Sequence, residues 1–129
     1  MDTVAQFLTI IRNAGTARHE KVDVPCSNLR LGIAKILQET DFIRSYKVAK
    51  DSKQGVMRVY LKYDDKGNHA ISKLQSVSTP GRRVYVKSDA IPVVRSGLGT
   101  SIMSTSQGII SGSKAKEKNL GGELLCVLW

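Results

Sequence analysis

Residues 99–111 read Gly99-Thr-Ser-Ile-Met-Ser-Thr-Ser-Gln-Gly-Ile-Ile-Ser111. Two β-prone stretches, 99–104 and 108–111, flank a short polar segment that ends in a glycine. This pattern is typical of a β-hairpin with a tight turn. The end of the chain, 123–129, is apolar and β-prone, and it predicts a buried closing strand. We therefore expect the second half of the chain to be mostly β-structure.

Shorter elements surround this hairpin. In the segment 88–96, Pro92 suits the first position of a short helix, and Gly97 suits the residue just past its end. The segment 69–77 is ambiguous by its period, and the flanking turn residues favour a strand. The expected elements are strands at 69–77 and 83–87, a tight turn at Pro80-Gly81, a short helix within 88–96 and one helical turn at 114–119.

The first half predicts the order helix–strand–helix–strand–strand. Thr3 and Gln6 match a capping box, and Ser27 is a candidate N-cap for the second helix. The apolar positions Val4, Phe7, Leu8 and Ile11 of the first helix share one face, as do Leu29, Ile33, Ile36 and Leu37 of the second. Strands are expected at 21–25, 42–49 and 56–63, the last two joined by a turn at 51–55.

The turn-forming segment 64–68 is the strongest internal break in the sequence. It divides the chain into an N-terminal α/β domain, 1–65, and a C-terminal β-rich domain, 66–129. The predicted fold class is α+β: two small domains, with helices over one sheet face in the first and a short helix in the second.

The charge is strongly positive and uneven. The 129 residues contain 20 Lys and Arg against 11 Asp and Glu, a net charge of +9. Residues 66–129 hold nine basic and three acidic residues, whereas residues 1–65 hold eleven and eight. A solvated surface normally mixes both signs. The excess in the second half instead favours a polyanionic partner, chiefly nucleic acid, and places the contact surface there.

The sequence gives little support for a membrane protein, an exported protein or a metal-binding protein. No apolar run approaches the roughly 20 residues that cross a bilayer, and no leader marks the chain for export, so we expect no membrane partner. Cys26 and Cys126 match no metal spacing. They leave a disulfide open but favour two buried, reduced thiols.

Nothing in the sequence points to catalysis. His19 and His69 adjoin predicted turns without a catalytic partner at a recognisable spacing, and we expect both to be exposed and unremarkable. The neighbouring carboxylates of Asp64 and Asp65 point apart on a turn, so they do not suggest an acid/base pair. We expect no enzyme activity, no metal or other cofactor and no small-molecule substrate.

The polar segment of the hairpin is the most informative motif. Ser104, Thr105 and Ser106 are three consecutive hydroxyls beside Gly108, which permits close backbone approach. Such a group can bind the sugars, phosphates and base edges of folded RNA. The same residues can equally well cap and turn a hairpin, and the residues alone leave both interpretations open.

The chain closely resembles the S-eight family of small-ribosomal-subunit proteins. The resemblance rests first on Ser-Thr-Ser-Gln-Gly-Ile-Ile at 104–110, followed by Lys114-Ala115 and by Leu-Gly-Gly-Glu-Leu at 120–124. It covers essentially the whole chain in order. Further matches are Ile-Arg-Asn-Ala-Gly at 11–15, Thr-Pro-Gly-Arg-Arg-Val-Tyr at 79–85, Ile-Pro-Val-Val at 91–94 and Gly-Leu-Gly at 97–99. The family has a two-domain fold, which agrees with the break at 64–68.

The resemblance implies a primary rRNA-binding protein. Such a protein binds a stem in the central domain of the small-subunit rRNA, promotes assembly of the platform and adjoins other ribosomal proteins of that subunit. Its location would be the small subunit of the cytoplasmic ribosome, with an organellar ribosome left open. A free-standing nucleic-acid-binding regulator that uses the same basic face is the alternative.

The resemblance also implies which residues meet RNA. The hydroxyl segment maps onto Ser104, Thr105, Ser106 and Gly108, with Gln107 where many members carry lysine. Tyr85 and Glu123 match positions near this surface, and Arg12 and Asn13 match a region that meets a neighbouring part of the RNA. Glu123 could instead hold a loop N–H or a cation, or be simply solvated. The basic residues expected around the segment are Lys73, Arg82, Arg83, Lys87, Lys114, Lys116 and Lys118.

Overall fold

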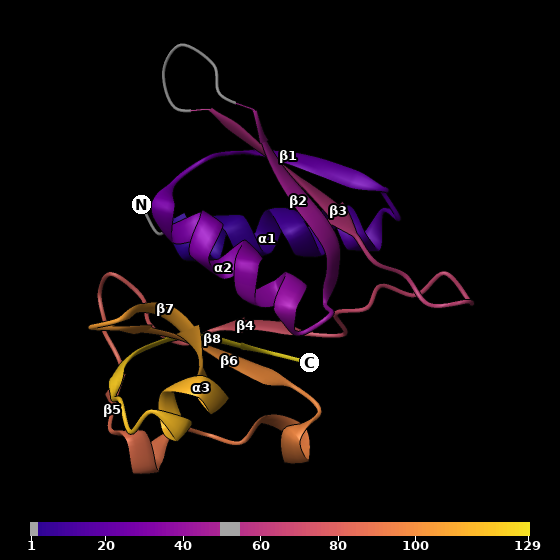
Figure 1. Ribbon diagram of the computed structural model, residues 1–129. Helices are drawn as coiled ribbons and strands as arrows, with labels where there is room; N and C mark the ends of the chain where they lie inside the picture. The colour runs from indigo at the N-terminus through magenta and orange to yellow at the C-terminus, as the bar shows by residue number, and fades with distance from the viewer. Residues whose placement is uncertain (1–2, 50–54) are drawn as a thin grey trace.

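The computed structural model describes residues 3–49 and 55–129, and these residues form two antiparallel sheets with helices packed on them (Figure 1). The elements are α1 (Thr3–Thr16), β1 (Lys21–Pro25), α2 (Asn28–Glu39), β2 (Ile43–Ala49), β3 (Val56–Leu61), β4 (Leu74–Ser76), β5 (Tyr85–Val86), the 3₁₀ helices η1 (Ser88–Ala90) and η2 (Val94–Gly97), β6 (Thr100–Thr105), β7 (Gly108–Ser111), α3 (Gly112–Glu117) and β8 (Gly122–Leu128). The α+β class is confirmed.

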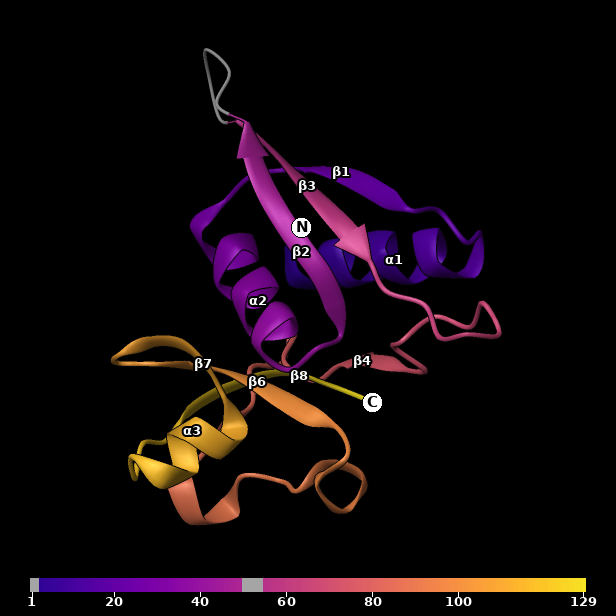
Figure 2. The ribbon, with the colours of Figure 1, turned by 45° about the vertical axis from the view of Figure 1, so that its right-hand side comes forward.

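The first half has the predicted order of elements. Its three strands lie in the order β1-β3-β2, and α1 and α2 cover one face of this sheet (Figures 1 and 2). The predicted helix faces bury Phe7 and Ile33 completely, and the alternation in β3 buries Met57 and Val59 against them. The predicted turn at 51–55 falls almost wholly on residues 50–54, which lie outside the described residues.

One helix start is confirmed, and the other involves a side chain outside the described ones. The Ser27 hydroxyl accepts a hydrogen bond from the backbone N–H of Arg30 and caps α2 as predicted. At α1, the capping box stays a prediction because the Thr3 side chain is not described, but the amide oxygen of Gln6 has a partner elsewhere. It accepts a hydrogen bond from Arg30 Nη2 at 3.1 Å, while Nη1 donates to the Pro25 carbonyl at 3.1 Å. Arg30 is only 5% exposed, so its buried charge needs these acceptors.

The second sheet is built around the end of the chain. Its strands lie in the order β4-β8-β6-β7, and β5 also pairs with β8. The predicted closing strand is therefore confirmed as the strand with the most partners. The predicted hairpin is confirmed as well, because Thr105 pairs with Gly108 and leaves a two-residue turn between β6 and β7. The turn at Pro80-Gly81 is closed by reciprocal backbone bonds of 3.0 Å between Thr79 and Arg82.

Several shorter elements differ from the prediction. The helix expected within 88–96 is two 3₁₀ helices, with Pro92 between them rather than at a helix start. Proline disfavours a helical conformation in the residue before it, and Ile91 is extended (φ −67°, ψ 125°). The strands expected at 83–87 and 69–77 are shorter than predicted: only β5 and β4, respectively, form within these ranges. The helix expected at 114–119 begins earlier, because Ser111 caps it by accepting from the Lys114 N–H.

The halves share one apolar core. Phe7, Ile33 and Met57 of the first half belong to the same buried cluster as Ile102 and Leu128 of the second. A smaller cluster joins β6 and β8 to α3 through Ile91, Met103, Ala115 and Leu124. The division into domains at 65/66 stays a prediction; the turn there is fastened by the Asp64 carboxylate, which accepts from the N–H groups of Lys66 and Asn68.

Both cysteines are free thiols, as the sequence favoured. Cys126 is completely buried in the shared core, and this burial raises the pKa of its thiol to about 12. Cys26 is half-buried rather than buried. The Cys126 thiol is therefore not arranged as a reactive group.

Candidate nucleic-acid interface

The tip of the β6–β7 hairpin presents polar atoms to solvent. The Thr105 hydroxyl donates to the Gly108 carbonyl at 2.9 Å and accepts from the Gln107 N–H at 3.2 Å. Gly108 has φ +105°, a conformation that side chains disfavour. The capping interpretation of the hydroxyl segment therefore holds for Thr105, whose side chain closes the turn.

The other two hydroxyls are placed differently. Ser106 is exposed, and no hydrogen bond involves its hydroxyl within residues 3–49 and 55–129. Ser104 is half-buried at the end of β6, and its side chain also lacks a partner in that part of the chain. These hydroxyls can both donate and accept, so Ser106 in particular is available to a ligand.

Three strands bring predicted site residues into one row. Tyr85 on β5 pairs with Glu123 on β8, and Glu123 pairs with Ser104 on β6. Directly opposed residues of antiparallel strands point to the same face, so the three side chains share a face next to the hairpin tip. Tyr85 is 70% exposed. A Cβ at Gly122 would collide with the Ser104 carbonyl oxygen, so glycine is required for this close approach.

Glu123 organises the loop before β5. Its carboxylate accepts from the Ser78 hydroxyl and pairs with Arg83 Nη1 at 3.2 Å. The Ser78 oxygen in turn accepts from the Val84 N–H at 3.2 Å. With a side-chain exposure of 17%, the carboxylate is largely removed from solvent. Of the alternatives open from sequence, Glu123 therefore holds a neighbouring cation.

The basic residues fall into two groups. Arg82, Lys87 and Lys116 are exposed and form no ion pair among the described residues, and Lys118 reaches the Gln107 amide oxygen at 3.4 Å. The others have partners within the protein. Lys114 Nζ lies 3.6 Å from Glu39 Oε2 on α2, and Lys73 Nζ lies 6.0 Å from the centroid of the Trp129 ring. Arg83 forms an ion pair with Glu123.

Arg12 and Asn13 lie apart from the hairpin. Both are exposed near the end of α1, at the opposite side of the molecule from the β6–β7 tip in both views (Figures 1 and 2). Arg12 lines a polar cavity of about 350 Å³ together with Arg18, Asn68 and His69. The structure thus places the predicted residues in two separate groups.

His69 differs from the prediction of an exposed, unremarkable residue. It is half-buried, with its ring tilted against Tyr63 at 5.5 Å between centroids, and burial lowers its pKa. Its Nε2 is buried without a hydrogen-bond partner in the described part of the chain. Gly15 makes this possible, because a Cβ there would collide with the imidazole. His19 is exposed as predicted.

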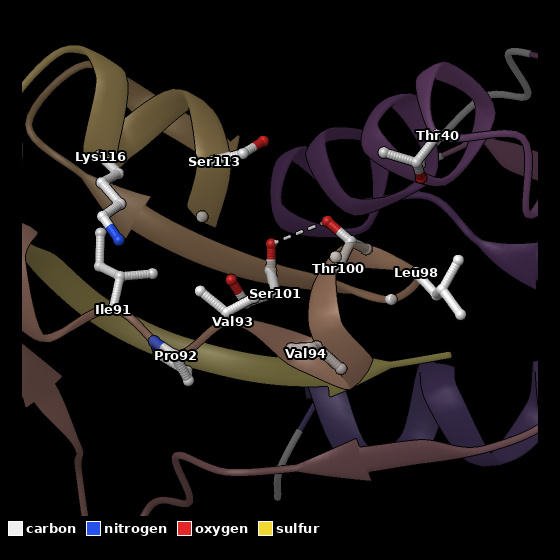
Figure 3. Close-up of a pocket in the computed structure, with 13 residues that line it drawn as sticks. Thr40, Ile91, Pro92, Val93, Val94, Leu98, Thr100, Ser101, Ser113 and Lys116 are labelled. Atoms are coloured by element: carbon white, nitrogen blue, oxygen red, sulfur yellow. Dashed lines mark hydrogen bonds between the residues drawn. The ribbon is translucent and has the colours of Figure 1, made fainter.

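The cavity beside the second sheet has no catalytic arrangement. It has a volume of about 390 Å³ and lies between the loop around Ile91–Leu98, β6 and the start of α3 (Figure 3). Of the described residues that line it, only Lys116 is titratable, and the Thr100 hydroxyl donates to the Ser101 carbonyl at 3.4 Å. No group of three or more potential metal ligands occurs among the residues described. In the same residues, no helix is long and apolar enough to span a membrane.

Comparisons with known proteins agree with these features. The family model for "Ribosomal protein S8" matches residues 2–129. A small ribosomal subunit protein uS8 of Bdellovibrio bacteriovorus is 69% identical over 129 residues, covering 100% of both chains. Proteins of the same name from Geotalea daltonii and Thermodesulfovibrio yellowstonii are 54% and 48% identical over 128 residues, covering 99% of this chain and 97% and 98% of theirs. The chain therefore belongs to the ribosomal protein S8 family.

Proposed function

We propose that the chain is a structural protein of the small ribosomal subunit that binds rRNA directly. It recognises a stem in the central domain of the small-subunit rRNA and promotes assembly of the platform, next to other ribosomal proteins. The family consists of structural ribosomal proteins, so the chain is not an enzyme, as the sequence predicted. Its place of action is the ribosome of the cytoplasm.

One observation carries the proposal: the exposed Ser106 hydroxyl stands beside the row of Tyr85, Glu123 and Ser104 in the basic half of the chain. The deep groove of A-form RNA excludes side chains, so proteins bind its shallow groove, irregular pairs and backbone. Short hydroxyls on a narrow hairpin suit the shallow groove, where 2′-hydroxyls and base edges are offered. The exposed Tyr85 ring provides a flat surface next to them.

The surrounding residues have different tasks in this proposal. Arg82, Lys87 and Lys118, together with the partly paired Lys114, supply contacts to phosphates and hence affinity. Thr105 and Gly108 shape the turn that presents Ser106 and Gln107. Glu123 positions Arg83 and the loop of 79–84, and so acts on the RNA through them.

Arg12 and Asn13 provide a second contact to a neighbouring part of the same RNA. Their distance from the hairpin means that the two groups meet separate RNA segments. Arg18 lines the same cavity as Arg12, so two guanidinium groups are available there for phosphates. A protein that holds two RNA segments at fixed positions would assist folding of the RNA around it.

Fractionation of a cell lysate tests the proposal. The protein carrying an affinity tag should co-sediment with small subunits in moderate salt, with little protein in the free fractions. A free-standing regulator, the alternative function, would instead occupy the free fractions and be absent from the subunits. That second distribution would refute the ribosomal role.

A further inference from the structure

The outer face of the first sheet is open. α1 and α2 cover the inner face, and in both views no other described element lies over the opposite side (Figures 1 and 2). A groove of about 480 Å³ runs across this outer face. The residues that line it come from all three strands: Asp23, Lys47, Val48, Ala49, Val56, Arg58 and Tyr60.

An aromatic ring and a cation meet in the groove. Tyr60 lies half-buried on β3, and Lys47 Nζ stands over its ring at 5.7 Å from the centroid. Lys21 pairs with Tyr60 across β1 and β3, which adds a second cation beside the same ring. Neither lysine forms an ion pair among the residues that the structure describes. Flat rings beside unpaired cations are typical of surfaces on which bases of single strands stack.

Among the described residues that line the groove, Asp23 is the one acid, and an arginine neutralises it. Arg58 Nε donates to Asp23 Oδ1 at 2.8 Å and Nη2 donates to Oδ2 at 3.2 Å, so the two side chains form a bidentate ion pair. This guanidinium holds the pKa of Asp23 below its ordinary value, so the carboxylate stays charged and engaged. The described residues that line the groove therefore keep a positive balance through Lys47. Its remaining wall is apolar and includes Val56, which is 37% exposed.

We propose that this groove binds one unpaired nucleotide of RNA, with its base against Tyr60 and Val56 and its phosphate at Lys47. The base would cover the exposed apolar wall, and the phosphate would neutralise the unpaired ammonium. A protein segment fits less well, because covering the groove with apolar side chains would desolvate Lys47 without supplying an opposite charge. The inference rests on the proposed RNA-binding function and adds a single-stranded site to it.

Binding of a labelled single-stranded oligouridine of eight nucleotides to the full chain tests the site. Tyr60→Phe keeps the ring and should bind as the parent protein does. Tyr60→Leu removes the ring, and the affinity should fall about 5-fold or more, the lower range for one stacked base. Lys47→Gln should reduce the slope of log affinity against log salt by about 0.7, the value for one phosphate of a single strand. Lys35→Gln, an exposed cation on α2, is the matched control and should lower the affinity less than Lys47→Gln does.

Two further measurements separate this site from the hairpin. Binding of a double-stranded stem from the central domain should be unchanged in Tyr60→Leu, whereas Ser106→Ala should weaken stem binding and leave oligouridine binding intact. Photochemical cross-linking of the oligouridine should label Tyr60 or its neighbours on β3. The inference would be overturned if Tyr60→Leu and Tyr60→Phe bound oligouridine with equal affinity, or if the oligouridine cross-linked to the hairpin instead. A cross-link from Tyr60 to a protein in intact subunits would also overturn it. If the parent protein binds the oligouridine but not the stem, the proposed function is refuted and this site still stands.

Discussion

Replacing Thr105 and Ser106 one at a time should separate turn closure from RNA recognition. Thr105→Ala removes a hydroxyl that makes two hydrogen bonds within the turn, at 2.9 and 3.2 Å. Ser106→Ala removes an exposed hydroxyl with no partner in the described part of the protein. The two variants delete the same kind of atom from adjacent positions, so each serves as the control for the other.

The expected magnitudes follow from these contacts. Each hydrogen bond in this solvent-exposed turn should contribute about 0.5 kcal/mol to the free energy of unfolding, the lower end of the usual range, so the two together contribute about 1 kcal/mol. For a chain of this length, Thr105→Ala should lower the melting temperature by about 3 °C. Ser106→Ala should change stability by about 0.5 kcal/mol or less. Its affinity for RNA should fall by about 1 to 1.5 kcal/mol, roughly 5- to 10-fold, because a partner on the RNA loses its hydrogen bond.

The assay pairs thermal unfolding of the free protein with RNA binding at two salt concentrations. Ser106→Ala should lose affinity with an intact melting temperature, and its salt slope should stay unchanged because no cation is removed. Thr105→Ala should lose both stability and affinity. Unchanged affinity in Ser106→Ala, or parallel losses of stability and affinity in that variant, would show that the hydroxyl does not contact RNA.

Four other outcomes are expected. Binding of the wild-type protein to its RNA stem should show a slope of log affinity against log salt of about −3 to −5, corresponding to four to six phosphate contacts, and titration over a range of salt checks this. Gln107→Lys should steepen that slope by about one if the position faces phosphate; an identical slope would place the side chain elsewhere, with Lys118 as its neighbour. Deletion of 124–129 removes most of β8, the partner of β4, β5 and β6, and should leave an insoluble or partly unfolded protein by circular dichroism. Burial lowers the pKa of His69, so as the pH falls below about 6.5 the imidazole takes up a proton in the unfolded chain before it does so in the folded protein. The free energy of unfolding of the wild type should therefore decline from pH 7 to pH 5 more steeply than that of His69→Gln. Equal declines for the two proteins in urea titrations would refute this.

The parts of the fold that follow a simple period were predictable. The faces of α1 and α2 and the alternation in β3 each repeat often enough to identify an element without its neighbours. Segments 83–87 and 88–96 were not, because their structure depends on distant partners. Only Tyr85–Val86 pairs with β8, and Ile91, which Pro92 keeps extended, is buried in the smaller core between the two 3₁₀ helices.

The candidate site was predictable from the sequence only in part. The hydroxyl segment stands out locally, but its interpretation depends on hydrogen bonds that distinguish Thr105 from Ser106. The contacts of Glu123 with Ser78 and Arg83 join residues 45 and 40 positions away, which no local pattern reveals. Likewise, the groove at Tyr60 and Lys47 requires the pairing of β2 with β3. In the strand expected at 56–63, Val56, Arg58 and Tyr60 occupy alternate positions, but nothing local shows that Lys47 lies beside them.

Footprinting of protein-free small-subunit rRNA with the purified chain tests the central claim most directly. If the protein is a primary rRNA-binding protein, it should protect nucleotides of one stem in the central domain without any other ribosomal protein. Ser106→Ala should weaken this protection at unchanged fold. Absence of protection until other ribosomal proteins are added, or protection spread over unrelated stems, would contradict direct and specific recognition by the hairpin.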